Sequence, residues 1–348
     1  MQKRVKIIIS LCATVTSLAI LLTLATLILT PKSNNPPERG LIGEYYGEVD
    51  KGYTHQVVFV GDCEVYESFI PPVLYEEYGI TSFVRGSSQQ TVWQSYYILE
   101  ETLERETPKA VVFNVLALKY GETPSESISR MSLEDMEWSK QKLAAIKASM
   151  TDEESLLSYF LPILRYHSRW SELQADDFKH AFNKHEDITH QGYLMQTGID
   201  PVDTSDNRKP DDLLNTVLPA RAIEYLDKMT ALCRENGIEL ILVKAPTNSI
   251  RYYWYPEWDA QMVDYAEKNG LAYYSLVGKD EEIGIDWSTD TYDKGLHFNV
   301  YGAEKFTSFF GKILAENHGI EDRRSDAEIS AIWEARIDSY YKERNGEK

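Results

Sequence analysis

The chain has 348 residues, and its 55 acidic residues outnumber its 36 basic residues, which gives a formal net charge of −19 at pH 7. Nucleic acids and anionic lipid surfaces bind basic faces, so this balance argues against either as the main ligand. The length suits one membrane-proximal segment followed by a single domain with insertions.

Residues 1–30 predict a membrane anchor. Lys3, Arg4 and Lys6 precede an uncharged stretch of 24 residues, Ile7 to Thr30, that is rich in Ile, Leu, Ala and Thr. About 20 apolar residues cross the hydrocarbon core, and basic residues stay on the cytoplasmic side. We therefore expect an uncleaved, single-pass anchor with the rest of the chain outside the cell membrane; a cleaved secretory signal is the alternative. The part outside would carry 33 − 55 = −22 charges.

Residues 31–55 are rich in Pro, Asn, Gly and Glu, and we expect a solvated linker there. Beyond it, short apolar runs alternate with helical patterns. The predicted strands are 56–60, 81–84, 110–116, 239–243 and 271–275. The predicted helices are 73–78, 89–105, 133–149, 212–236, 257–268, 302–317 and 326–342. This alternation predicts an α/β domain with a parallel sheet covered by helices on both faces.

The predicted α/β domain spans residues 56–320 and contains one long interruption. Residues 117–210 contain no convincing strand, so we expect a helical insertion there. Residues 321–348 are highly charged, but Ile329, Ile332, Trp333 and Tyr340 recur at helical spacing. This stripe predicts a C-terminal helix that packs on the domain rather than on a ligand.

The segment Val57–Cys63 is an apolar run that ends in Gly61-Asp62-Cys63. In parallel sheets ligands bind beyond the carboxyl ends of the strands, and a glycine there allows a sharp turn that presents the next side chain. Cys63 could be a nucleophile at this edge. On this segment alone, a small buried residue is the favoured interpretation, because free cysteines are often buried.

Three further segments stand at comparable places. Gly86 follows the second predicted strand, Asn114 lies in the third, and Asp290 and Asp293 precede His297 just before the last domain helix. With Gly61-Asp62-Cys63, these blocks resemble the SGNH/GDSL hydrolase superfamily, in the order of that family's motifs. Two features depart from the family: a thiol replaces its serine, and three residues instead of two separate Asp293 from His297.

This resemblance implies a flavodoxin-like α/β/α fold and cleavage or transfer of ester-linked acyl groups. It assigns Cys63 as nucleophile, His297 as base and Asp293 as the acid that orients the base, with Asp290 as the alternative acid. The backbone N–H groups of Cys63 and Gly86 and the amide of Asn114 would stabilise the oxyanion. The anchored layout is similar to the envelope acyl-transfer members of the superfamily, such as the teichoic-acid D-alanylation and alginate-acetylation proteins.

Two aromatic segments are candidates for substrate binding. Arg169 and Trp170 lie in the insertion, and Trp254 and Tyr255 follow the fourth predicted strand. Aromatic rings there could stack on sugars. Packing over the sheet explains Trp254 and Tyr255 equally well, and pairing with the many acidic residues is the favoured interpretation for Arg169 taken alone. His167, His180, His185 and His190 show no recognised metal spacing, and there is no glycine-rich phosphate loop, so we expect no metal and no cofactor.

The sequence thus predicts an extracytoplasmic, anchored SGNH-like esterase or O-acyltransferase with a Cys63-His297-Asp293 triad. Its expected partners are a cell-envelope polysaccharide or acylated polymer, the membrane through the N-terminal helix, and a membrane acyltransferase as a further candidate, but no nucleic acid. The alternative is a catalytically inactive SGNH-fold module that binds envelope polysaccharide or helps to assemble it, because the family's serine is absent.

Overall fold

The computed structural model describes residues 2–31, 41–179, 181, 188–201, 216–248 and 255–347. The chain divides into two compact units: residues 1–39 with 150–186, and residues 40–149 with 187–348. The second unit, which we call the α/β unit, contains the predicted sheet.

The α/β unit is built on five parallel strands: β1 (Val57–Gly61), β2 (Ser82–Gly86), β3 (Ala110–Asn114), β4 (Glu239–Lys244) and β5 (Ala272–Ser275). Their order in the sheet is β2-β1-β3-β4-β5, and every pairing is parallel. This is the flavodoxin-like strand order. Strands are added to one side of β1 and then to the other, and this switch leaves a crevice at the carboxyl ends of β1 and β3. The expected fold class is confirmed, because each of the five predicted strands forms.

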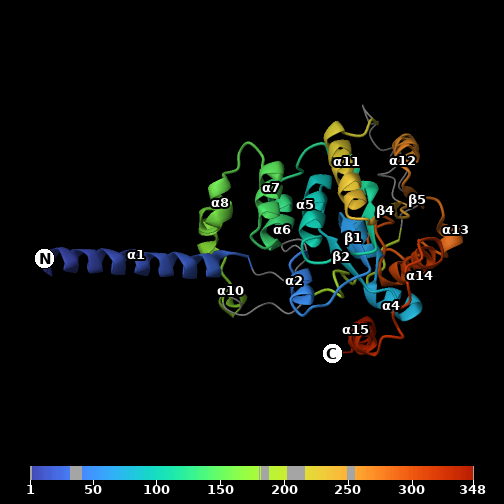
Figure 1. Ribbon diagram of the computed structural model, residues 1–348. Coiled ribbons are helices and arrows are strands. Elements are labelled where there is room, and N and C mark those ends of the chain that lie inside the picture. The colour runs from blue at the N-terminus through green and yellow to red at the C-terminus, as the bar shows by residue number, and fades with distance from the viewer. Residues whose placement is uncertain are drawn as a thin grey trace. The chain divides into compact units, whose positions relative to one another are not determined.

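Helices cover both faces of the sheet (Figure 1). Those of the α/β unit are α2 (Glu44–Val49), α3 (Cys63–Ser68), α4 (Pro71–Tyr78), α5 (Val92–Thr102), α6 (Glu126–Asp135), α7 (Lys140–Ser149), α11 (Ala220–Glu235), α12 (Tyr255–Asn269), α13 (Asp280–Ile283), α14 (Val300–Asn317) and α15 (Ala327–Arg344). A short 3-10 helix, η2 (Val115–Lys119), follows β3 directly.

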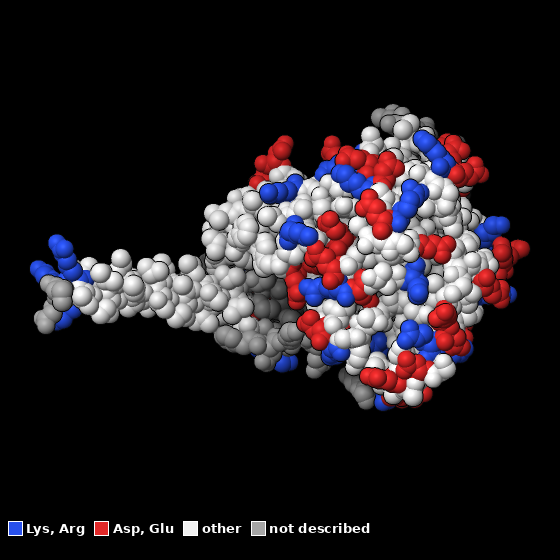
Figure 2. Space-filling model, in the orientation of Figure 1, with Lys and Arg blue, Asp and Glu red and all other residues white. Residues whose placement is uncertain are grey.

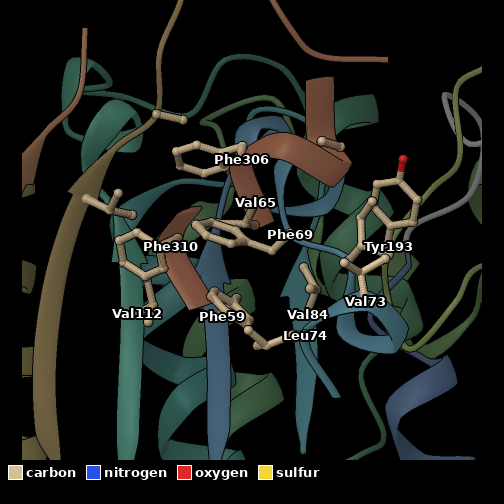
Figure 3. Close-up of a cluster of buried hydrophobic side chains, with 14 of the residues drawn as sticks. Phe59, Val65, Phe69, Val73, Leu74, Val84, Val112, Tyr193, Phe306 and Phe310 are labelled. Carbon is tan, nitrogen blue, oxygen red and sulfur yellow. The ribbon is translucent and has the colours of Figure 1, made fainter. Parts of the chain in front are cut away.

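Alternating strand residues supply two separate cores. Phe59, Val84 and Val112 pack with α3, α4 and α14 on one face, where Phe69 stacks on Phe59 with ring centroids 4.2 Å apart (Figure 3). On the other face, the neighbouring strand residues pack with α5, α11 and α12. The strands are therefore apolar on both sides, as buried parallel strands must be.

Residues 41–55 differ from the expected linker. They include helix α2, and Leu41, Ile42, Tyr45 and Tyr46 are buried. The hydroxyl of Tyr45 donates to Glu106 at 2.7 Å and that of Tyr46 to Glu101 at 2.6 Å. The polar composition thus concealed two tyrosines whose rings lie in the core while their hydroxyl groups are paired.

The predicted helix 133–149 is two helices, α6 and α7. Met136 is extended, and the backbone N–H of Glu137 donates to the hydroxyl of Tyr46. The side chain of Ser139 then accepts from the N–H of Lys142 and begins the second helix. At the C-terminus, α15 packs as expected: Trp333 and Tyr340 are buried, and Trp333 stacks on Tyr75 at 5.0 Å.

The first unit contains α1 (Gln2–Leu29), α8 (Leu156–Phe160), α9 (Ile163–Tyr166), the 3-10 helix η3 (His167–Ser171) and α10 (Ala175–Lys179). Residues Lys3–Leu29 form one helix that is long and apolar enough to cross a membrane. Figure 2 shows basic side chains at the tip of α1 and uncharged residues along the rest of its visible face.

Candidate active site

The site begins at the turn between β1 and α3. Gly61 has φ +155°, a region that side chains other than glycine rarely adopt. The side chain of Asp62 then accepts from the N–H of Glu64 at 3.2 Å and caps α3. Cys63 is the first residue of α3, at the carboxyl end of β1.

The structure brings together the three residues predicted as a triad. Cys63 Sγ lies 3.0 Å from His297 Nε2, and His297 Nδ1 lies 2.6 Å from Asp293 Oδ2. Asp293 Oδ1 also accepts from the backbone N–H of His297 at 2.8 Å. The alternative acid, Asp290, points elsewhere and binds Lys305 Nζ at 2.6 Å. Asp293 is therefore the carboxylate at the histidine.

The three residues between Asp293 and His297 form a tight turn. Lys294 and Gly295 have φ values of +64° and +80°, and the N–H of Gly295 donates to Thr291 Oγ1 at 2.9 Å. Two successive left-handed residues bend the chain back, so that the carboxylate reaches the ring four positions later. The unusual spacing of this block is thus compatible with the Asp-His contact.

A second carboxylate, which the sequence analysis missed, contacts the same ring nitrogen. Glu67 Oε2 lies 3.2 Å from His297 Nδ1, and Glu67 Oε1 accepts from the hydroxyl of Tyr292 at 2.7 Å. The side chain of Glu67 is 4 % exposed, whereas that of Asp293 is 25 % exposed. Glu67 follows Cys63 by four residues on α3, so this helical spacing was the available signal.

The electrostatics of the site raise the pKa of both the histidine and the thiol. Burial opposes the charge on His297, but Glu67, Cys63 and Asp293 outweigh it and raise the pKa of His297 well above its usual 6.5. Burial also raises the pKa of the Cys63 thiol, against the pull of His297. The pKa of Glu67 rises to about 7, chiefly through burial. For Asp293, contacts with His297 outweigh burial and lower the pKa.

Beneath the site lies a buried ion pair. Lys244 Nζ, at the end of β4, donates to Glu64 Oε1 at 2.6 Å and to the carbonyl of Ala245 at 2.8 Å. Asn114 Nδ2 donates to Glu64 Oε2 at 2.8 Å, and its Oδ1 accepts from the N–H of Leu116 at 2.9 Å. These contacts join the ends of β3 and β4 to the first turn of α3. Asn114 therefore supports the first turn of α3, and it is not among the residues that line the cavity.

Gly86 also lies behind the site. A Cβ atom at this position would come within 2.3 Å of the Val65 side chain and 3.2 Å of the Asp62 carbonyl. The missing side chain thus allows β2 to approach the turn that carries Cys63. In the loop that follows, Gln89 has φ +49°, a strained value for a residue other than glycine.

A cavity of about 390 Å³ opens over the triad. Its lining is mixed, with tyrosine rings, one lysine and small polar groups around the thiol. The lining residues are Cys63, Tyr66, Glu67, Ser88, Gln89, Lys119, Tyr120, Tyr292, Leu296 and His297. Of these, the sequence analysis identified Cys63 and His297. The others come from loops and helix faces whose convergence depends on the strand order.

The structure describes two of the four candidate substrate-binding residues in full. Arg169 and Trp170 belong to the first unit, where Arg169 binds the Leu29 carbonyl at 2.5 Å and Asp177 at 3.2 Å. Trp254 and the side chain of Tyr255 lie outside the described residues. Within the described ranges, no group of three or more His, Cys, Asp or Glu side chains is arranged to hold a metal ion.

The fold and the site define a doubly wound α/β protein with a Cys-His-Asp constellation at the carboxyl end of its first strand, as the SGNH/GDSL resemblance predicts. No family model and no curated protein matches the chain. Among solved structures, it is similar to a protein assigned to the G-D-S-L lipolytic family from Desulfitobacterium hafniense DCB-2. The identity is 11 %, 75 % of this chain and 100 % of the other are covered, and the TM-score is 0.37.

A second similar structure is a protein assigned as an acylhydrolase from Bacteroides fragilis NCTC 9343. It shares 12 % identity, covers 83 % of this chain and 91 % of its own, and has a TM-score of 0.35. The first protein is thus assigned to the G-D-S-L family, and the second is assigned only as an acylhydrolase. At these TM-scores neither likeness carries an argument about function, so the chemistry below rests on the side chains of this chain.

Proposed function

We propose that the protein is an acyl-ester hydrolase or O-acyltransferase that uses Cys63, His297 and Asp293. The observation that carries the proposal is the continuous chain of contacts from Cys63 Sγ to His297 Nε2 at 3.0 Å and from His297 Nδ1 to Asp293 at 2.6 Å, beside a cavity. A nucleophile within hydrogen-bond reach of a base, itself oriented by a carboxylate, is the arrangement that acyl transfer requires.

In the first half-reaction, neutral His297 takes the thiol proton at Nε2 and the Cys63 sulfur attacks the acyl carbonyl. The C–O bond of the tetrahedral intermediate then breaks, and the alcohol leaves with the proton from Nε2. In the second half-reaction, His297 deprotonates water or an acceptor hydroxyl, which attacks the thioester and releases the thiol. Asp293 and Glu67 stabilise the imidazolium that forms in both halves.

We place this chemistry outside the cell, on a polysaccharide or other polymer of the cell envelope. The support is the apolar helix α1, whose basic residues precede its uncharged stretch, and the acidic remainder of the chain. The tyrosines around the cavity suit a hydroxyl-rich ligand, because their rings can pack against sugars while hydroxyl groups and Lys119 supply hydrogen bonds. A membrane acyltransferase could supply the acyl group.

The test is Cys63→Ala, with Cys233→Ala as the matched control, assayed on p-nitrophenyl acetate with mass spectrometry of the protein. Cys233 is buried in α11 and takes no part in the site. We expect wild type and the control to acquire one acetyl group and to turn over, and Cys63→Ala to do neither. An inert wild-type thiol at alkaline pH, with no acetyl adduct, would favour the inactive polysaccharide-binding module instead.

A further inference from the structure

The helices of the first unit carry an unusual number of exposed apolar side chains. Six of them, between 45 and 73 % exposed, lie within residues 157–178: Leu157, Phe160, Leu161, Leu164, Trp170 and Phe178. Figure 2 shows an uncharged surface over the region that α8 occupies in Figure 1. Soluble surfaces rarely gather so many large apolar groups, and such patches mark interaction sites.

These helices pack around one end of α1. Helix α1 contacts α9, η3 and α10, and Arg169 Nη1 donates to the carbonyl of Leu29 at 2.5 Å. A second contact of Arg169, to Asp177 at 3.2 Å, ties η3 to α10. Residues 24–29 of α1 are half-buried, whereas residues 3–23 are exposed. We call residues 150–179 the collar, because they surround only this end of the helix.

The position of the collar coincides with the outer membrane boundary that the length of α1 predicts. A helix rises 1.5 Å per residue, so about 20 residues cross a hydrocarbon core of about 30 Å. Counted from Ile7, the first residue after the basic group, the core ends near Thr26. The part of α1 that the collar covers begins at residue 24. It therefore lies at the depth of the lipid headgroups, where tryptophan and other amphipathic side chains concentrate.

From this coincidence we infer that the collar lies in the outer membrane interface and inserts its apolar side chains into the headgroup and upper acyl region of the lipid. The apolar contact with lipid comes from Leu157, Phe160, Leu161 and Leu164. Trp170 lies at the interface, where its ring can contact acyl chains and its N–H can donate to headgroups or water. Acidic residues such as Glu153 remain in water. This inference rests on the anchoring role proposed for α1, and it is independent of the acyl chemistry.

The inference can be tested on the full chain reconstituted in phosphatidylcholine vesicles. Single cysteines replace Phe160, Trp170, Glu153 or Leu18 in a chain carrying Cys12→Ala, Cys63→Ala and Cys233→Ala, and each is labelled with the environment-sensitive fluorophore NBD. Phospholipids with a nitroxide near the headgroup or deep in the acyl chain then report the depth of each label. Glu153 is the matched control, because it is exposed in the same unit but charged.

We expect labels at Phe160→Cys and Trp170→Cys to lose intensity with the headgroup-proximal nitroxide, and the label at Glu153→Cys to keep it. The label at Leu18→Cys should be quenched by the deep nitroxide. If Leu18→Cys is quenched while positions 160 and 170 behave like 153, the collar does not touch lipid and the inference is overturned. If Leu18→Cys is not quenched, the anchor and the collar are both wrong, and the proposed acyl chemistry is unaffected.

Discussion

His297 has carboxylates from two different elements on one ring nitrogen. Asp293 comes from the turn before α14 and is partly exposed, whereas Glu67 comes from α3 and is buried. A single carboxylate is enough to set the tautomer of a catalytic histidine. The second adds negative charge in a place shielded from water, and this charge favours the imidazolium. Glu67 is therefore one of the groups that raise the pKa of His297.

Glu67→Gln should move the reactivity of Cys63 to lower pH. The pKa of His297 is raised above 6.5 and that of Cys63 above 9.0, so the wild-type thiol should react with iodoacetamide mainly in alkaline solution. Removing the Glu67 charge lowers both pKa values. The pH at half-maximal alkylation should therefore fall, while the exposed Glu267→Gln on α12, with the same chemical change, leaves it in place. An unchanged midpoint in Glu67→Gln would mean that Glu67 has no electrostatic effect on the pair.

Substitutions of the two aspartates before His297 should affect different properties: catalytic turnover for Asp293 and stability for Asp290. Asp293→Asn removes the orienting carboxylate and should slow ester turnover by about 100-fold or more, with little loss of stability. Asp290→Asn breaks a buried contact with Lys305 and should lower the free energy of unfolding by about 1–3 kcal/mol. Ester kinetics and urea unfolding on both variants measure this. Equal loss of turnover in both would show that Asp290 also acts on the histidine.

Sequence patterns predicted the triad residues but not their electrostatic surroundings. Cys63, Asp293 and His297 lie in short blocks that end strands or precede helices, so local patterns were sufficient to select three side chains that the structure brings together. Asn114 occupied the expected place, but its amide is engaged by Glu64. That contact joins residues 50 positions apart, and Lys244 reaches Glu64 across 180 positions. Pairings of this kind follow from strand order, which no local pattern contains.

At the scale of elements, the position of α3 depends on the close approach of β2. Val65, one turn into α3, lies over Gly86, and the Glu64–Lys244 ion pair holds the same turn from below. Helix α3 is only six residues long, so most of its stability must come from these contacts. The pattern of apolar runs predicted all five strands, because buried parallel strands need little beyond continuous apolar residues.

Gly86→Ala should displace α3 and lower both stability and activity. The added Cβ would lie 2.3 Å from Val65, and overpacking of this kind costs about 1–3 kcal/mol. The control is Gly47→Ala in α2, where a Cβ meets nothing within 4 Å. This control should be neutral or slightly stabilising, because alanine is the better helix former. Thermal unfolding and ester turnover of Gly86→Ala and Gly47→Ala test this prediction. Equal melting temperatures for the two variants would contradict the packing argument.

At the scale of the whole molecule, the main features are the excess of acidic residues and the apolar N-terminal helix. The expected linker and insertion were defined from composition, and the structure divides the chain differently: residues 41–149 belong to the α/β unit, and residues 150–186 associate with α1. Composition could not reveal this, because tyrosines with paired hydroxyl groups and an amphipathic collar both resemble polar surface in the sequence. Only the contacts of these residues distinguish them from ordinary polar surface.

The orientation of the chain in the membrane should depend on Lys3, Arg4 and Lys6. In spheroplasts of a bacterial expression host, external protease should digest the α/β unit of the wild type. Replacing these three residues with Glu removes the cytoplasmic basic group and should leave a larger protected fraction. The control replaces three exposed lysines of the α/β unit, Lys147, Lys268 and Lys279, with Glu. Equal protection of all three chains would argue against the predicted orientation.

The distance along the chain between Cys63 and His297 has a consequence for biosynthesis. The two residues that meet at 3.0 Å are 234 positions apart. At about 5–20 residues per second, the ribosome needs about 10–50 s to reach His297 after it has added Cys63. Throughout that interval the thiol of Cys63 has no histidine beside it, and β1 can pack only against segments that have already been synthesised. A chain exported during synthesis would expose Cys63 to oxidants and to Cys233 before the fold separates them, so an oxidising host should trap a fraction of young chains in a disulfide that the finished protein lacks.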